Sequence, residues 1–317
     1  MMHDATTPYF GPVFWDATQL HAKLDRLVDL AWQPGWAPLA LGELIHLCAW
    51  LRHGQGAGSW AEVQAALASH PLHRLMLEDP LIYHAAASPP VWLDLLLGHA
   101  DAAPLTNDIS RAGRDLFAAT RDLAWPAALR GRTAFLARMV DAVAAEAPGA
   151  SILTLGAGHL REAAGVTAAS SLQRWSVIEP EYTARQTLLR GLPKGLAVQF
   201  LRCSLRGFAR QPLGRGVFDL VCLPALSEGW DDATLNTLVG AAFQVLKPGG
   251  RLLICAPGKA PPEAAWMEAV LRCTPRWTGT GEMEALLEPV RASHCALRQV
   301  FPSVDGHMIY AILRRRG

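Results

Sequence analysis

The chain has 317 residues, of which 51% are hydrophobic and 18% are charged, and its formal net charge is +1. This length suits two domains, or one domain with a large extension, and the apolar content is enough for a sizeable core. A charge so close to zero gives no electrostatic argument for nucleic acid or a membrane surface as a partner.

The cysteines and the apolar runs indicate a cellular compartment. The six cysteines are scattered without CxxC spacing, and several lie in apolar strand-like runs, which is typical of buried free thiols in a reducing compartment. Residues 1–8 are polar, and no apolar run reaches the roughly 18–20 residues of a membrane helix. We therefore expect a cytoplasmic protein. No His, Cys or Asp cluster has metal-ligand spacing, so no metal is predicted.

The first residues form an arm that carries aromatic side chains. Tyr9, Phe14 and Trp15 are its candidate functional residues. Two roles are open: they staple the arm onto the first helix, or they form a lid over a cofactor site, because aromatic faces attract a sulfonium cation.

Apolar residues at helical spacing predict an all-helical domain over residues 1–125. Ser59 and Glu62 form a capping box before one of these helices. The tryptophans of this region are expected in its core, among them Trp32, Trp50 and Trp60. The predicted helices are 16–31, 39–53, 59–69, a short one between the prolines at 71 and 80, 90–97 and 110–121.

The centre of the second domain is a strand, a glycine turn and a helix. A long helix over 127–147 leads into a buried strand ending at Leu155, then into Gly156-Ala157-Gly158-His159, and then into a predicted helix over 160–169. Glycines let the backbone approach a nucleotide-type ligand, and a helix N-terminus offers unpaired N–H groups. A second strand, 175–178, ends in Glu179, where a ribose diol finds its acceptor.

The remaining elements continue the alternation of strands and helices. Asp305-Gly306 is predicted to separate the two strands of a closing hairpin. The other expected segments are a helix over 181–190, strands over 196–201 and 218–223, a helix over 231–246, a Leu-Lys-Pro-Gly-Gly turn with a strand to 254, helices over 262–272 and 281–287, and hairpin strands over 295–301 and 307–313.

This series resembles the class I S-adenosylmethionine-dependent methyltransferases, whose fifth strand is typically entered through such a Leu-Lys-Pro-Gly-Gly turn. The resemblance implies an α/β, Rossmann-like domain over 126–317. Its sheet would have seven strands, mostly parallel, with a C-terminal antiparallel hairpin, and the N-terminal helices would form a cap. It also implies S-adenosylmethionine as the cofactor.

The resemblance assigns roles to further residues. Pro180, Ser204, Leu205 and Leu223 join the turn and Glu179 in the cofactor site, with Ser204 and Leu205 beside the adenine. Arg132, on the long helix, becomes a candidate for the cofactor carboxylate, because guanidinium suits bidentate pairing. A solvated helix face is an equally open role for it.

Residues at the reacting end come from two places. Phe135 on the long helix and Trp230 in the loop after the fourth strand are candidate substrate contacts. A base is needed only if the acceptor is protonated, and His159 and Glu228 are the candidates. Hydrogen bonding within the turn is an equally open role for His159, and Glu228 could be an ordinary exposed carboxylate.

Several stretches resemble one bacterial group, the methyltransferases of 3-hydroxypalmitic acid methyl ester biosynthesis. The matches are His70-Pro71-Leu72, Glu78-Asp79-Pro80, the stretch 156–162, Trp266-Met267-Glu268 and Glu282-Met283. The acceptor-side loops differ, since 88–92 and 223–230 replace polar loops of that group. The resemblance therefore supports the cofactor more than a fatty-acid acceptor.

Three functions remain open at this stage. The first is methyl transfer to a small molecule, with S-adenosylhomocysteine as product. The second is attack on the γ-carbon of the cofactor by its own amine, which releases methylthioadenosine and forms azetidine-2-carboxylate. The third is a cofactor-binding scaffold without catalysis. A homodimer is a further possibility.

Overall fold

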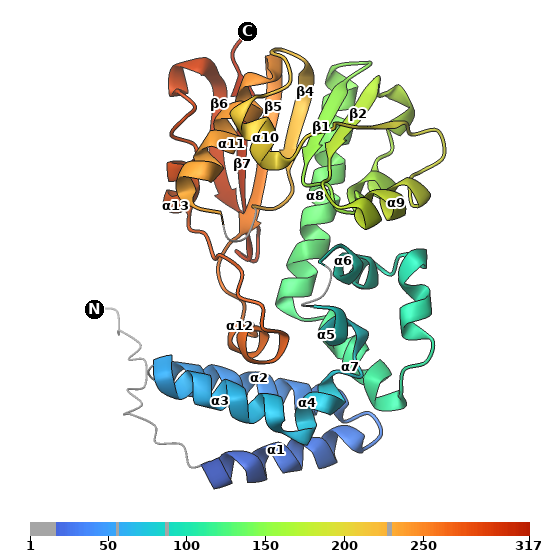
Figure 1. Cartoon of the computed structure of the whole chain (residues 1–317), viewed down its shortest axis with the longest axis vertical. Coiled ribbons are helices and arrows are strands. Elements are labelled where there is room, and N and C mark those ends of the chain that lie inside the picture. Colours follow the sequence, from blue (N-terminus) through green and yellow to red (C-terminus); the bar gives the residue numbers. More distant parts are fainter. Residues whose placement is uncertain (1–16, 55–56, 86–88, 227–229) are drawn as a thin grey trace, which may run out of the picture. The chain divides into compact units, whose positions relative to one another are not determined.

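The computed structural model describes residues 17–54, 57–85, 89–226 and 230–317 (Figure 1). The chain divides into two compact units. One comprises Met1–Ala124 together with Pro261–Thr274 and is called the helical unit below. The other comprises Trp125–Ala260 and Pro275–Gly317 and is called the sheet unit. The segment Pro261–Thr274 thus leaves the sheet unit and packs with the helices, an exchange that the sequence analysis does not foresee.

The sheet unit is built on one seven-stranded sheet in the order β3-β2-β1-β4-β5-β7-β6. The first five strands run parallel, and β7 pairs antiparallel with both β5 and β6. The predicted fold class, a Rossmann-like mostly parallel sheet with a C-terminal antiparallel hairpin and an N-terminal helical region, is confirmed. The strands are β1 (Ser151–Leu155), β2 (Arg174–Ile178), β3 (Val198–Phe200), β4 (Phe218–Leu223), β5 (Leu246–Pro257), β6 (Cys295–Pro302) and β7 (Met308–Arg315).

Helices cover both faces of this sheet, which explains why its central strands are continuous apolar runs. All residues of β1 are buried. One core joins alternate residues of β4, β5 and β7 with α10 (Leu205–Arg210), α11 (Asp232–Gln244) and α13 (Thr280–Leu286). On the opposite face α8 (Ala124–Glu146) brings Phe135 against Tyr310 of β7. The remaining helix is α9 (Tyr182–Arg190).

Side-chain caps stabilise two short helices of the helical unit, and two hydrogen bonds join its first helices to the segment Pro261–Thr274. His70 and Asp79 accept the N–H groups of Leu72 and Leu81 and thereby cap two short helices. Arg52 and Gln64 donate to Glu268, at 3.2 Å and 3.3 Å. The elements are α1 (Ala17–Trp32), α2 (Ala37–Gly54), α3 (Ala57–Ser69), α4 (Pro71–Met76), α5 (Pro80–His84), α6 (Pro89–Leu97), the 3₁₀ helix η1 (Ala100–Thr106), α7 (Arg111–Arg121), α12 (Ala264–Trp266) and the π-helix η4 (Met267–Leu271).

The predicted helix over 160–169 is wrong. The chain forms two 3₁₀ turns instead, η2 (Arg161–Gly165) and η3 (Ala169–Ser171). Leu160 has a left-handed φ of 52°, which a continuing α-helix does not allow. The Asp141 carboxylate on α8 then accepts the N–H groups of Thr167 and Ala168, at 2.9 Å and 2.8 Å. Hydrogen bonds to a distant side chain thus replace the backbone hydrogen bonds of a helix.

Three further boundaries differ from the prediction. The short helix predicted between the two prolines is α4, and Asp79 begins a further helix at Pro80, α5, that the prediction lacks. The helix predicted over 262–272 is the short α12 followed by the π-helix η4. Leu246 starts β5 instead of ending α11, and Lys247 bridges to Asp219 of β4 at 2.7 Å.

The prediction that the tryptophans of the helical unit are core residues is only partly right. Trp60 is buried, with 3% of its surface exposed. Trp32, Trp36 and Trp50 are exposed by 54%, 48% and 44%. Helical spacing therefore identified the helices of this region but did not show which of their tryptophans are buried.

Among the helices described, none combines the length and the apolar character needed to cross a membrane.

Candidate functional site

The glycine turn after β1 has the geometry that its residues suggest. Gly156 and Gly158 adopt left-handed φ values of 75° and 52°. The Gly156 N–H donates to the Ile178 carbonyl of β2 at 2.9 Å. A Cβ added at Gly156 would lie 3.7 Å from Leu205 Cδ1, so the first residue of α10 sits beside the turn. Glycine is needed here for the backbone angle, because side-chain residues are strained at such φ values.

Glu179 closes this turn from the tip of β2. Its Oε2 accepts the N–H of Gly158 at 2.7 Å, and its Oε1 accepts the N–H of Glu181 at 3.0 Å. The side chain is 9% exposed. The carboxylate is therefore fixed by two backbone donors, and each oxygen keeps a second lone pair for another donor.

The other predicted cofactor residues lie around the same strand ends. Leu155 and Leu223 are buried in the sheet core at the ends of the neighbouring strands β1 and β4. Ala157 is buried within the turn, whereas Pro180 is exposed directly after Glu179. The structure thus gathers these residues at one edge of the sheet, where parallel α/β proteins bind their ligands.

Ser204 has a local role that the sequence analysis does not anticipate. Its hydroxyl accepts the N–H of Gly207 at 3.0 Å and caps α10, a helix absent from the prediction. A serine before Leu205 is itself a helix-start signal. Its predicted contact with adenine stays a prediction.

Of the two candidate bases, the structure describes His159 but not Glu228. His159 is buried in the glycine turn. Glu228 lies outside the described residues, as do the predicted lid residues Tyr9, Phe14 and Trp15.

Arg132 on α8 lies close to a buried carboxyl at the start of η2. That carboxyl belongs to Glu162, which is 5% exposed. Burial raises the pKa of Glu162 to about 6, while its own N–H and the positive charge of Arg132 lower the pKa. Nε of Arg132 and Oε1 of Glu162 are both buried without a hydrogen-bond partner among the described residues. A cation and an anion with unused bonding capacity thus lie together directly after the glycine turn.

The predicted substrate residue Phe135 belongs to an aromatic group on the same face of the sheet. Its ring centroid lies 4.5 Å from that of Tyr310 and 6.2 Å from that of Phe301. Burial raises the pKa of Tyr310 to about 12, so its phenol is neutral. The positive charge of Arg132 acts on Tyr310 as well, which places the aromatic group beside the Arg132–Glu162 pair.

Trp230, the other predicted substrate residue, has a different neighbour. The Arg206 guanidinium of α10 lies 5.3 Å from the centre of its ring, a cation–π distance. Among the described residues, Trp230 packs against the core on the α10 and α11 face, away from the Phe135 group.

Glu162 and Tyr310 are the residues that sequence analysis missed as site candidates. Glu162 stands in the stretch 156–162, one of those on which the sequence resemblance was based, and that was its available signal. Tyr310 had none, because its place beside Phe135 depends on β7 pairing with β5.

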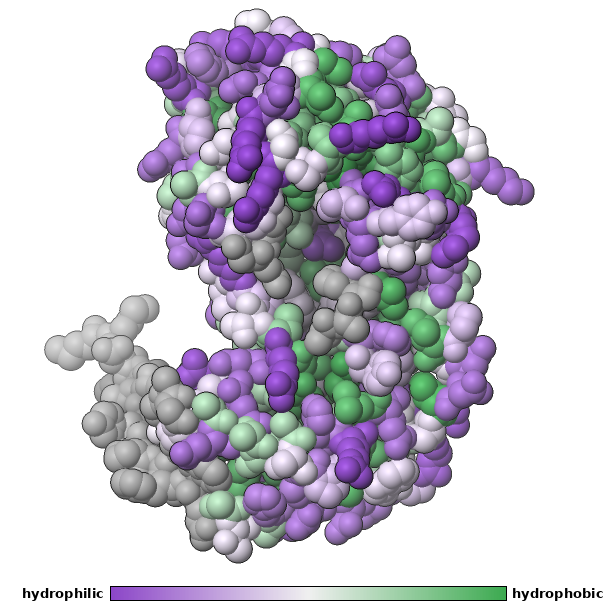
Figure 2. Space-filling model, in the orientation of Figure 1, coloured by the Kyte–Doolittle hydropathy of each residue, from purple (hydrophilic) through white to green (hydrophobic). Residues whose placement is uncertain are grey.

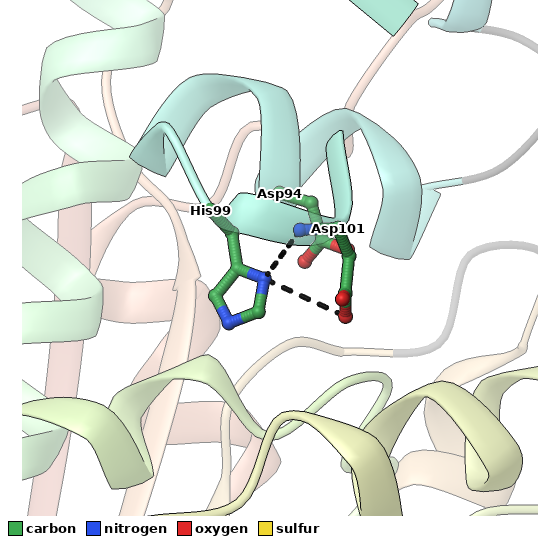
Figure 3. A group of neighbouring side chains, drawn as sticks. All are labelled: Asp94, His99 and Asp101. Carbon is green, nitrogen blue, oxygen red and sulfur yellow. Dashed lines mark hydrogen bonds and ion pairs between the residues drawn. The ribbon is translucent and has the colours of Figure 1, made fainter. Parts of the chain in front are cut away.

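Asp94, His99 and Asp101 form a separate group in the helical unit (Figure 3). One ligand atom from each lies within 4.8 Å of the others. However, the His99 Nδ1 accepts the Asp101 N–H at 3.2 Å and caps η1, while its other ring nitrogen points away (Figure 3). The nitrogen that faces the carboxylates is already used, so this group is best explained as a helix cap.

No protein-family model matches the chain, and no curated protein matches it by sequence. Among solved structures, a possible exported protein from Bordetella parapertussis is similar over 96% of this chain and 98% of its own, at 17% identity and a TM-score of 0.58. At this identity the similarity establishes a shared fold alone.

Two methyltransferases match smaller parts of the chain. The 1,6-didemethyltoxoflavin-N1-methyltransferase of Burkholderia thailandensis, solved with S-adenosylhomocysteine, covers 65% of this chain and 83% of its own, at 20% identity and a TM-score of 0.39. The N-methyltransferase NodS of Bradyrhizobium japonicum covers 59% of this chain and 96% of its own, at 16% identity and a TM-score of 0.41. Both TM-scores are too low to add to the conclusion on fold.

Proposed function

We propose that this protein is an S-adenosylmethionine-dependent methyltransferase that acts on a small molecule. The observation that carries the proposal is the Glu179 carboxylate, fixed by backbone donors at the tip of β2 and bonded to the glycine turn after β1. In a sheet of this order, that position is where an acidic residue accepts the hydroxyl groups of a ribose.

The adenosine end of the cofactor fits the edge of the sheet between β1 and β2. The left-handed glycines keep side chains away from the turn, so the backbone is open to a ligand. Leu205 beside Gly156 offers an apolar surface of the kind that a nucleobase contacts. A 3₁₀ turn replaces the α-helix that was predicted after the glycine turn. The groups that would hold the adenosine are therefore the glycine turn and Glu179, without an α-helix N-terminus.

The methionine end of the cofactor is a zwitterion and needs one positive and one negative partner. Arg132 and Glu162 supply this pair, and each has a buried polar atom without a partner. Buried polar atoms are nearly always bonded in native proteins, so a ligand that bonds to both Arg132 and Glu162 would satisfy these two groups. The cofactor carboxylate would bind Arg132, and its ammonium group would bind Glu162.

The chemistry asks little more of the side chains. The cofactor supplies an electrophilic methyl group on a positively charged sulfur, and the protein contributes mostly alignment of donor and acceptor. Phe135 and the neutral Tyr310 lie beside the Arg132–Glu162 pair, and their ring faces would favour the sulfonium charge. Of the two candidate bases, His159 is the one among the described residues, and it lies in the glycine turn.

The acceptor is proposed on the narrower sequence resemblance alone. The stretch 156–162 and the segments around residues 70–80 resemble methyltransferases of 3-hydroxypalmitic acid methyl ester biosynthesis. Hydroxy fatty acids are therefore the first acceptors to test. A cap role for the helical unit, a homodimer and a cytoplasmic location stay predictions.

The test is to incubate the purified protein with S-adenosylmethionine, first alone and then with each of a panel of acceptors led by 3-hydroxy fatty acids, and to identify products by mass. We expect the cofactor to stay intact alone and to yield S-adenosylhomocysteine with one acceptor. Methylthioadenosine formed without an acceptor, together with a matching four-carbon amino acid, would show γ-carbon chemistry instead. Cofactor that is neither bound nor converted under any condition would contradict both enzymatic readings.

A further inference from the structure

A hollow of the sheet unit lies on the face covered by α10 and α11, with a volume of about 880 Å³. The end of α10, the second half of α11, the segment before β6 and the end of β7 line it. In Figure 2, hydrophilic side chains predominate over the part of the unit where α10, α11 and α13 lie. We call this hollow the basic groove.

The basic groove has a one-sided charge. Its lining contains five arginines and no Asp or Glu side chain, although the whole chain carries a net charge of only +1. The arginines are Arg210, Arg215, Arg291, Arg315 and Arg316, and His294 lies beside them. Five arginines with no acidic side chain among them repel one another, so this arrangement favours an anion between them.

Two of these arginines are fixed by the fold, and three have free guanidinium groups. Arg315 donates to the Gln244 and Leu246 carbonyls at 3.1 Å and 2.6 Å, which holds its charge at the end of α11. Arg316 donates to the Cys295 carbonyl at 3.2 Å. The guanidinium groups of the other three, Arg210, Arg215 and Arg291, form no hydrogen bond or ion pair with any described residue.

The groove also offers contacts for an uncharged part of a ligand. Phe243 is buried in its wall. The side-chain oxygen of Asn236, also in the lining, is buried and has no partner among the described residues. Both are covered, so the contacts open to a sugar or base are the exposed hydroxyl groups of Thr237 and Ser293 in the same lining.

The basic groove is distinct from the proposed cofactor site. β7 is antiparallel, so its last residues lie beside the first residues of β5, where Arg251 pairs with Arg314. The groove therefore lies at the edge of the sheet where the parallel strands begin. The glycine turn follows the end of β1, at the opposite edge.

We propose that the basic groove binds a small organic ligand with two or more phosphate groups, such as a nucleotide or a sugar diphosphate. Free guanidinium groups from three separate segments match several phosphates, because each can form a bidentate bond. The volume falls within the range of small-molecule pockets. One compact group of charges on a chain with little net charge is unlike the extended basic stripe of a nucleic-acid surface.

The test is calorimetric titration of the full chain with inorganic pyrophosphate and tripolyphosphate at low salt. The variants are Arg210→Ala and Arg291→Ala, whose exposed and unpaired side chains can be removed without harm to folding. The matched control is Arg314→Ala, which removes the same charge one residue before Arg315, from the other face of β7. Thermal unfolding of each variant checks its fold.

We expect one polyphosphate per chain, with affinity that falls as salt is added. Each groove variant should weaken binding by about tenfold, since a charge-assisted bond is lost, and the control by less than about twofold. No polyphosphate binding, or equal weakening by Arg314→Ala, would overturn the proposal. So would tighter binding of a short single-stranded DNA or an acidic peptide than of tripolyphosphate.

Discussion

The helical and sheet units each bury one carboxyl group whose pKa is raised to about 6, Asp79 in the first and Glu162 in the second. Burial is the leading cause in both. Each carboxyl also keeps one buried oxygen without a hydrogen-bond partner among the described residues. By pKa and burial alone, the two groups cannot be told apart.

Their surroundings differ. Asp79 Oδ1 accepts the Leu81 N–H at 2.7 Å and begins α5, so its carboxyl has a structural task. Glu162 lies within reach of the charge of Arg132, directly after the glycine turn, and Arg132 is itself short of a partner. A raised pKa therefore reports burial alone, and the proposed site depends on the neighbouring charge of Arg132.

The largest effect on the proposed site is expected from Arg132→Ala. Removing the cation deprives the cofactor carboxylate of its partner and leaves Glu162 buried beside no positive charge. We expect the affinity for S-adenosylmethionine to fall about a hundredfold, measured by calorimetry. Arg190→Ala, which removes an exposed guanidinium group at the end of α9, is the control and should leave affinity nearly unchanged. Equal effects of the two changes would remove Arg132 from the site.

Asp79→Asn should change stability without changing cofactor affinity. The folded-state pKa, about 6, lies above the ordinary value of 3.8, so this group stabilises the fold below pH 3.8 and loses that contribution as pH rises through 6. Relative to the wild type, the free energy of unfolding of the variant should rise by about 2 kcal/mol between pH 4 and 8. Urea unfolding at the two pH values measures this gain. A loss of S-adenosylmethionine affinity would contradict the purely structural role.

Glu162→Gln should show both effects. The pKa is raised from 4.5 to about 6, so its stabilising contribution is present below pH 4.5 and lost as pH rises through 6. Relative to the wild type, the free energy of unfolding of the variant should therefore rise by about 2 kcal/mol between pH 4.5 and 7.5. Urea unfolding measures this change. Unlike Asp79→Asn, it should also weaken S-adenosylmethionine binding. If affinity stays the same, Glu162 is a buried carboxyl like Asp79.

The smallest effect is expected at Ser204. Ser204→Ala removes the cap of α10 and should cost about 1 kcal/mol in the free energy of unfolding. Ser204→Asn keeps a capping acceptor and should recover most of that stability. If both variants lose cofactor affinity in equal measure, Ser204 contacts the cofactor in addition to capping the helix.

The sequence predicts the sheet well because its signals are local. The apolar runs around Leu155 and Val221 are strands that are buried throughout, apart from Asp219 of β4, and the glycine turn needs its glycines for left-handed backbone angles. The acidic residue after β2 lies against that turn, as strand order and spacing suggest. These features depend on residues that are close in sequence or aligned by parallel pairing.

Features set by distant contacts were not predictable. The helix predicted after the turn does not form, because Leu160 has a left-handed backbone conformation and the Asp141 carboxylate on α8 accepts the N–H groups of residues 167 and 168. The Arg132–Glu162 pair joins two segments that carry no common motif. The exposed Trp32 and Trp50 show that spacing reveals a helix but not how far its surface is covered.

The central claim is that S-adenosylmethionine binds at the turn after β1 with its ribose on Glu179, and calorimetry on three proteins tests it most directly. The wild type is compared with Glu179→Gln and with the control Glu181→Gln, an exposed acid two residues further on. We predict binding to the wild type and to the control, and affinity at least about tenfold weaker for Glu179→Gln, because a neutral amide accepts hydrogen bonds less strongly. Equal affinity of all three proteins, or no binding to the wild type, would contradict the claim.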